Sequence, residues 1–198
     1  MLFRSAKFKI VGGKALDGEV KISGAKNAAL PILLSTILTD EKVLLKNVPD
    51  LADVKTSFKL LQDFGKVCTY DVEKGEAVIE NGITNHVASY ELVKTMRASI
   101  MALGPLVSYA GSAEVSLPGG CAIGARPVDL HIKGLMEIGA QIKLDDGYIK
   151  ANAIGSGRLH GGHIIMDKVS VTGTENLMMA ATLADGIKIG RALCRERV

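Results

Sequence analysis

The order of predicted elements repeats along the chain, and this repeat constrains the fold more than any other feature. Each copy follows the order helix, strand, helix, strand, strand. The first copy is predicted as a helix over 28–38, a strand over 42–45, a helix over 51–64 and strands over 66–71 and 76–80. The second is predicted as a helix over 92–109, a strand over 113–117, a helix over 127–138 and strands over 141–144 and 148–151. Internal repeats of this kind indicate copies that bury a shared core.

Matching residues support the repeat. Phe64-Gly65 ends one predicted helix and Ile138-Gly139 ends its counterpart, as expected for glycine C-caps. A third copy begins with a strand over 163–166 and a helix over 175–183, and continues to a strand over 187–189. Chance repetition of common α/β turns is the alternative, but the preserved order of five elements favours a true repeat. Three copies with helices inside and sheets outside would enclose one core.

Composition and charge exclude several classes of protein. Hydrophobic residues make up 47% of the 198 residues, which is enough to form a core. The formal net charge of +3 is too small to indicate binding to nucleic acid or a membrane. The longest apolar run, 28–34, is far too short to span a bilayer, and residues 1–7 lack the apolar core of a signal peptide. We therefore expect a cytoplasmic protein without nucleic-acid or membrane partners.

Cysteine usage points to one thiol rather than to disulfides or metal. The three cysteines are an odd number and have no metal-like spacing, so we expect no disulfide framework and no metal site. Cys121 lies in the glycine-rich stretch 117–131, which predicts a loop. Arg126 and a helix start at Pro127 follow it, and such neighbours lower the pKa of a thiol. A buried structural cysteine in a turn is the alternative, although the flanking glycines offer little apolar surface for it.

Other polar residues sit where helices are predicted to begin. Lys26-Asn27 precedes a helix, where free backbone N–H groups favour an anion; a solvated lysine beside an Asn N-cap is equally compatible. Arg97 lies among ordinary helix residues, and the segment 168–171 could hold a phosphate. Asp129 and His131 alone would indicate a polar helix face. The sequence lacks the glycine patterns of P-loop and Rossmann nucleotide sites.

Four stretches, taken together, resemble a known family. They are 23–31 (Ser-Gly-Ala-Lys-Asn-Ala-Ala-Leu-Pro), 94–99 (Lys-Thr-Met-Arg-Ala-Ser), 117–131 around Gly-Gly-Cys, and 166–171 (Met-Asp-Lys-Val-Ser-Val). In this order they closely resemble the UDP-N-acetylglucosamine 1-carboxyvinyltransferase family, the enolpyruvyl transferases that begin bacterial peptidoglycan synthesis. The shikimate-pathway enolpyruvyl transferases share the fold but not the Gly-Gly-Cys loop.

The resemblance implies a fold and a reaction. The fold would be the inside-out α/β barrel, in which each of two domains contains three βαβαββ units. The reaction would transfer enolpyruvyl from phosphoenolpyruvate to the 3′-hydroxyl of UDP-N-acetylglucosamine and release phosphate, without a metal or organic cofactor. Such an enzyme would be the target of fosfomycin and would act in cell-wall synthesis, on which cell shape and division depend.

The resemblance also assigns roles to individual residues. Cys121 would protonate the methylene carbon of phosphoenolpyruvate, could attach covalently to its C2, and would be alkylated by fosfomycin. Lys26 and Asn27 would contact phosphoenolpyruvate and the sugar, Arg97 would bind near the nucleotide sugar, and Arg126 would pair with the phosphate of phosphoenolpyruvate. The uridine diphosphate site would be lined by Arg126, Pro127, Val128, Asp129, Leu130, Lys168, Val169, Ser170 and Val171.

The chain departs from the family in its extent. Residues 7–11 and 19–22 alternate as strands do. We expect residues 1–21 to hold N-terminal strands, 7–11 among them, that belong to an absent second domain, 22–187 to form the first domain with an incomplete third repeat, and 188–198 to be a divergent tail. This pattern suggests a truncated or frame-shifted product with little turnover alone. A split enzyme with a complementing C-terminal half, a non-catalytic UDP-sugar-binding fragment, and a fragment that aggregates through its incomplete repeat are the alternatives.

Overall fold

The computed structural model describes residues 9–13, 15, 17–117 and 128–186. Two of its units follow the predicted repeat. The first consists of α1 (Lys26–Ser35) with the 3-10 turn η1 (Thr36–Leu38), β1 (Val43–Leu45), α2 (Ala52–Asp63), β2 (Val67–Asp71) and β3 (Glu76–Glu80). The second consists of β4 (Val87–Ala88), α3 (Tyr90–Val93), η2 (Arg97–Ala102), α4 (Leu103–Ala110), β5 (Ser112–Ser116), α5 (Asp129–Glu137), β6 (Ala140–Asp145) and β7 (Tyr148–Ala153). The last described helix is α6 (Val171–Thr182).

The two units build equivalent sheets. In the first, β3 pairs antiparallel with both β1 and β2, and Val43 lies opposite Ile79. In the second, β7 pairs antiparallel with both β5 and β6, and Val115 lies opposite Ile149. The short strand β4, which the sequence did not predict, adds a parallel edge to β5. The repeat predicted from element order is therefore confirmed in its first two copies.

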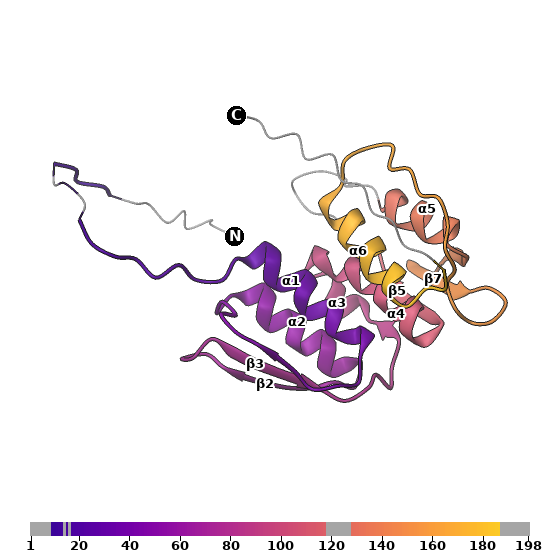
Figure 1. Ribbon diagram of the computed structural model, residues 1–198, viewed down its shortest axis with the longest axis horizontal. Coiled ribbons are helices and arrows are strands. Elements are labelled where there is room, and N and C mark those ends of the chain that lie inside the picture. The colour runs from indigo at the N-terminus through magenta and orange to yellow at the C-terminus, as the bar shows by residue number, and fades with distance from the viewer. Residues whose placement is uncertain (1–8, 14, 16, 118–127, 187–198) are drawn as a thin grey trace.

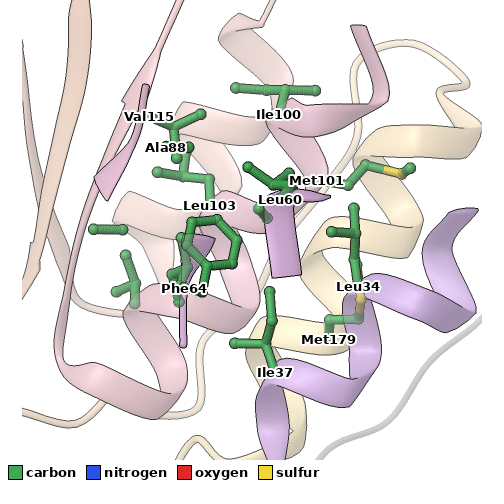
Figure 2. Close-up of a cluster of buried hydrophobic side chains, with 14 of the residues drawn as sticks. Leu34, Ile37, Leu60, Phe64, Ala88, Ile100, Met101, Leu103, Val115 and Met179 are labelled. Carbon is green, nitrogen blue, oxygen red and sulfur yellow. The ribbon is translucent and has the colours of Figure 1, made fainter. Parts of the chain in front are cut away.

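The helices enclose the core and the sheets cover it from outside (Figure 1). Helix α4 is central, because it packs against α6 on one side and against β5 and β7 on the other. One continuous cluster of apolar side chains links both units (Figure 2). Its members come from α1 and η1, α2, η2 and α4, both sheets, and α6; they include Leu34, Ile37, Leu60, Phe64, Met101, Leu103, Val115 and Met179. A single shared core makes the described units one structural body.

The third copy differs from its prediction. Residues 163–166 form no strand. The isolated parallel bridge of this region joins His160 to Asp185, which lie before this segment and after α6. A strand needs a neighbour to complete its backbone hydrogen bonds, and no described strand pairs with 163–166. Ile164 and Met166 of this segment instead pack against the core as partly buried side chains. The predicted strand at 187–189 lies outside the described residues.

The described residues ahead of α1 run away from the body (Figure 1). The alternating residues 19–22, predicted as a strand, are extended but unpaired, and Val20 and Ile22 are about four-fifths exposed. Ile10 and Val11 are exposed to the same degree. Alternation thus marked residues suited to a sheet, but no described strand pairs with them. Among the described residues, no helix has the length and apolar character needed to cross a membrane.

Candidate functional site

Three helical segments run side by side in the same direction. Gly104 N–H in α4 donates to Asn176 Oδ1 in α6 at 2.8 Å, and one turn later Ser108 Oγ donates to the Ala180 carbonyl at 2.6 Å. Both contacts advance by four residues along both helices, so α4 and α6 are parallel. Figure 1 shows that α1 begins on the same side of the molecule as α6. Parallel helices place their free N–H groups, and the positive ends of their dipoles, at one common end.

A pocket marks the opposite end of these helices. Its lining includes Leu38 after α1, Ser108 and Tyr109 in the last turn of α4, and Leu183 after α6. Asp40 also lines it and accepts a hydrogen bond from the Tyr109 hydroxyl. None of the predicted site residues that the structure describes lines this pocket. The candidate site therefore lies at the N-terminal end of the helices, on open surface rather than in this cavity.

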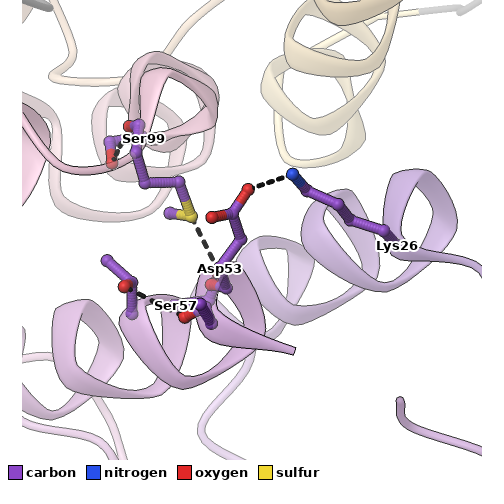
Figure 3. A network of polar contacts seen from close by, with 7 residues as sticks. Lys26, Asp53, Ser57 and Ser99 are labelled. Atoms are coloured by element: carbon purple, nitrogen blue, oxygen red, sulfur yellow. Dashed lines mark hydrogen bonds and ion pairs between the residues drawn. The ribbon is translucent and has the colours of Figure 1, made fainter. Parts of the chain in front are cut away.

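Lys26 occupies the first position of α1, and Asn27 follows it on an exposed turn. The Lys26 ammonium forms an ion pair with Asp53 in the first turn of α2 (Figure 3). Ala25 is the N-cap and no side chain caps the helix, so the alternative that Asn27 serves as an N-cap is wrong. Within the described part of the chain, the first-turn N–H groups of α1 therefore have no side-chain acceptor, as an anion site requires.

Arg97 begins a helical segment, although the sequence predicted one unbroken helix over 92–109. The helix breaks at Met96, whose backbone is extended (φ −143°, ψ 107°), and η2 starts at Arg97. Ser57 Oγ contacts the Met96 sulfur at 3.4 Å and Ser99 Oγ donates to the Met96 carbonyl at 2.6 Å (Figure 3). These contacts hold the break, which places the half-buried Arg97 at a helix start instead of in a helix middle.

The segment 168–171 leads into α6. Helix α6 begins at Val171, four residues before the predicted start at 175. Gly173 therefore lies within the first turn of the helix and does not precede it. Ser170 is the N-cap, and its hydroxyl accepts a hydrogen bond from Gly173 N–H at 3.1 Å. Lys168, Val169 and Val171 are exposed. The whole predicted segment is therefore a surface element at a helix N-terminus.

The segment 128–130 likewise leads into its helix, α5. Val128 precedes the helix, Asp129 is exposed in its first turn and Leu130 is buried. His131 is only 3% exposed, so the polar helix face suggested by Asp129 and His131 is wrong: the two side chains point to different environments. Burial lowers the pKa of His131, and the nearby Asp129 carboxylate partly opposes this.

Three predicted site residues, Cys121, Arg126 and Pro127, lie outside the described residues. The described cysteine, Cys68, is a free thiol in β2, and burial raises its pKa to about 11. A thiol with such a pKa is protonated and unreactive at neutral pH. Among the residues that the structure describes, no cluster of His, Cys, Asp and Glu is arranged to hold a metal ion.

Two residues next to the site were missed from the sequence. Asp53 pairs with Lys26 across 27 positions, and no local pattern signals that pairing. Asn176, fully buried in α6, hydrogen-bonds both α4 and His131. The burial of His131 could have been predicted from the sequence, because His131 shares one face of α5 with Gly134, Leu135 and Ile138, and this face is buried.

Comparison with known proteins identifies the class. The family model described as EPSP synthase (3-phosphoshikimate 1-carboxyvinyltransferase) matches residues 10–193. The chain therefore belongs to the EPSP synthase family of carboxyvinyltransferases. The match continues past residue 187, into the segment expected to diverge.

Curated relatives show which carboxyvinyltransferase the chain resembles. The UDP-N-acetylglucosamine 1-carboxyvinyltransferase of Aeromonas hydrophila is 62% identical over 190 residues, a match that covers 96% of this chain and 44% of the relative. The enzyme of the same name from Idiomarina loihiensis is 56% identical, with 96% of this chain and 45% of the relative covered. The resemblance read from the four motifs is confirmed, and the chain spans less than half the length of these relatives.

Solved structures confirm the fold class. EPSP synthase from Acinetobacter baumannii aligns with a TM-score of 0.70 at 17% identity, over 88% of this chain and 40% of that one. The enolpyruvyl transferase NikO from Streptomyces tendae aligns with a TM-score of 0.60 at 21% identity, over 72% of this chain and 31% of that one. The predicted enolpyruvyl transferase fold is therefore correct for the part of the chain that aligns.

Proposed function

We propose that this chain forms the first domain of an enzyme that transfers enolpyruvyl from phosphoenolpyruvate to the 3′-hydroxyl of UDP-N-acetylglucosamine. The observation that carries the proposal is the gathering of helix starts that bear Lys26, Arg97 and the segment 168–171. Both substrates are polyanions, so helix N-termini and basic side chains at one end of the domain suit them. The identity with the Aeromonas enzyme points to the particular pair of substrates.

The proposed roles divide between the two substrates. Lys26 and Asn27, at the start of α1, would bind phosphoenolpyruvate and the sugar, and Asp53 would hold the Lys26 ammonium in place before substrate arrives. Arg97 would approach the nucleotide sugar from the start of η2. Residues 128–130 and 168–171 would bind the uridine diphosphate group, with Lys168 supplying charge and the first turn of α6 supplying N–H groups.

The chemical step would use the residues of the loop. The Cys121 thiol would give its proton to the methylene carbon of phosphoenolpyruvate while the sugar hydroxyl adds to C2, and the hydroxyl proton would pass to a base. Loss of phosphate, together with a proton from the new methyl group, would then restore the double bond. Arg126 and Pro127 would hold the phosphate of phosphoenolpyruvate and the start of the diphosphate site. Preorganised positive charge around the phosphate is the main source of rate in such a step.

A second domain is part of this proposal. The curated relatives are more than twice as long as the matched region, so a C-terminal half would supply the opposite wall of the cleft and close it over the substrates. The segments that carry the exposed apolar residues Ile10, Val11, Val20 and Ile22 would find their strand partners there. The proposal also includes the cytoplasmic location and the role in peptidoglycan synthesis that the resemblance implies.

Phosphate release tests the enzymatic proposal. The purified chain is incubated with both substrates, alone and together with a separately expressed C-terminal half of a relative, beside a Cys121→Ala control. We expect little release by the chain alone, and release with the added half that disappears in the control. Release that persists in the control, or no release in any combination, would contradict the assigned chemistry.

The alternative is a fragment that binds UDP-sugar without chemistry. It is favoured by the segments 128–130 and 168–171, which belong to this chain and need no second domain. Fosfomycin distinguishes the two proposals, because the enzyme proposal predicts covalent labelling of Cys121. Mass spectrometry of the peptides would show modification at Cys121 and none at Cys68, whose thiol is protonated. Binding of UDP-N-acetylglucosamine without labelling would favour the binding fragment.

A further inference from the structure

A buried hydrogen-bond chain joins α4, α6 and α5. Gly104 N–H donates to Asn176 Oδ1 at 2.8 Å, and Asn176 Nδ2 lies 2.9 Å from His131 Nδ1. Asn176 is fully buried and His131 is 3% exposed. The contact between Asn176 and His131 joins α6 to α5. Both helices start at the segments assigned above to the uridine diphosphate group.

The backbone N–H of Gly104 fixes which group donates and which accepts along the whole hydrogen-bond chain. A main-chain N–H can only donate, so the amide of Asn176 must turn its oxygen toward Gly104 and its NH₂ group toward His131. The Nδ1 atom of His131 must then accept, which requires a neutral imidazole with its proton on Nε2. Protonated histidine carries hydrogens on both nitrogens, so it would present a donor to a donor. The contact therefore exists for one protonation state of His131 only.

Tight packing leaves α6 little freedom to adjust. A Cβ atom at Gly104 would lie 2.4 Å from both the backbone oxygen and Oδ1 of Asn176. A Cβ atom at Gly134 of α5 would lie 2.4 Å from a methyl carbon of Leu177. Helix α6 thus approaches the backbone of α4 most closely at Gly104, whereas at Gly134 it meets α5 through the end of the Leu177 side chain. The amide of Asn176 sits between the two helices.

The location argues for more than general stability. His131 directly follows Leu130, and Asn176 lies about one and a half turns beyond Val171 on α6. An apolar pair would fill this space without a need for matched donors and acceptors, whereas a fully satisfied buried polar network selects one arrangement of its helices. A second polar link joins α5 to the segment ahead of α6. It is the ion pair of Lys133 with Asp167 at 3.1 Å, which is exposed at both ends.

We propose that the hydrogen-bond chain from Gly104 through Asn176 to His131 is a positioning element for nucleotide-sugar binding. It fixes how the start of α5 stands relative to the start of α6, and so sets the spacing of the segments 128–130 and 168–171. Neither His131 nor Asn176 contacts the ligand. The inference rests on the proposed function, because it presumes that both segments bind one uridine diphosphate.

The surroundings of His131 make this element sensitive to acid. The charged groups on α5 and on the elements packed against it are Asp129, Lys133, Glu137, Lys143, Asp145 and Glu175. Of these, Asp129 is the group whose charge acts on the pKa of His131, and burial outweighs it. The neutral state is therefore retained at neutral pH and lost only in acid.

Two replacements of Asn176 separate the role from stability. Asn176→Leu removes both hydrogen bonds, whereas Asn176→Asp keeps an acceptor for Gly104 and offers a second acceptor, which favours a proton on His131 Nδ1. Dissociation constants for UDP-N-acetylglucosamine are measured by calorimetry on the 198-residue chain from about pH 8 to about pH 5. Circular dichroism on the same samples reports whether each variant is folded.

The expected results differ between the variants. Wild-type affinity falls toward the acid end, and Asn176→Leu binds about tenfold more weakly at the alkaline end. Asn176→Asp binds within about threefold of wild type and loses the acid-side fall. Lys133→Met, which removes the exposed link instead, keeps the wild-type affinity and pH profile.

Each contrary result has a distinct meaning. A folded Asn176→Leu variant with wild-type affinity would overturn the positioning role, as would an Asn176→Asp variant that keeps the wild-type pH profile. The pH profile of Asn176→Asp tests the positioning role even if Asn176→Leu does not fold. Failure of the wild-type chain to bind at every pH would instead reject the proposed function, and the role in binding with it.

Discussion

The candidate site is bordered by two helix pairs that are joined in different ways. Helices α1 and α2 are joined by the ion pair of Lys26 and Asp53, whose side chains are 50% and 30% exposed. Helices α5 and α6 are joined by His131 and Asn176, which are almost completely buried. An exposed pair of charges is screened by salt and tolerates movement, whereas a buried hydrogen bond demands one geometry and one protonation state. The first joint would suit the role proposed for Lys26, which would release Asp53 to bind substrate, and the second would suit a fixed frame.

The largest predicted effect is at the packing around the buried joint. Gly104→Ala should lower the free energy of unfolding by about 3 kcal/mol, because its Cβ atom would meet the backbone of α6. Gly134→Ala is the matched control. Its Cβ atom would meet only the end of the Leu177 side chain, which can rotate, and alanine favours the helix. Urea denaturation measures both, and equal losses would show that α6 is less tightly held by α4 than the structure indicates.

The next effect is a pH dependence at the buried joint. Burial lowers the pKa of His131 below its ordinary value of 6.5, so the unfolded chain binds this proton more strongly than the folded chain. The stability that depends on neutral His131 is complete above about 6.5 and is lost as the pH falls below it toward the folded-state pKa.

Urea denaturation at several pH values checks this expectation. His131→Gln should flatten the acid side of the stability profile, whereas His86→Gln, at an exposed side chain, should leave it unchanged. An acid-side slope that survives in His131→Gln would place the responsible group elsewhere.

Coupling energies should rank the two joints directly. A double-mutant cycle with Lys26→Met and Asp53→Asn should give a coupling of about 0.5 kcal/mol that vanishes in high salt. A cycle with His131→Phe and Asn176→Leu should give a larger coupling that salt does not change, because both groups are buried. A salt-resistant coupling between Lys26 and Asp53 would remove the proposed contrast.

The smallest effect is expected at the exposed link between α5 and α6. Lys133→Met should leave the urea midpoint unchanged within measurement error, because Lys133 and Asp167 are each more than 60% exposed. A clear loss of stability in this variant would mean that the exposed ion pair, rather than the buried amide, holds the two helices together.

Much of the architecture could be predicted from the sequence because it depends on local patterns. The helical face of Val54, Phe58 and Leu61 and the hairpin pairing around Gly75 and Gly147 lie within short windows of chain. Patterns of this length encode the period of an element and the turn that ends it. The predicted helix over 51–64 and its neighbouring strands accordingly agree with α2, β2 and β3.

Errors arose where distant contacts decide local structure. Met96 interrupts a segment predicted as one helix, and its sulfur contacts Ser57, a residue 39 positions earlier in the chain. The early start of α6 is a local exception, because Ser170 caps the helix only three residues before Gly173. The alternating residue pattern at 19–22 forms no strand because no described strand pairs with it.

By itself, the sequence determined the repeat, the elements with strong local periodicity and, through four short motifs, the family. Only the tertiary structure decided which residues meet: Asp53 with Lys26, and Asn176 with both Gly104 and His131. The physical reason is that hydrophobic periodicity is written in neighbouring residues, whereas a buried donor finds its acceptor only when the helices have packed. The same packing turned His131 from an apparent surface group into a buried imidazole confined to one tautomer.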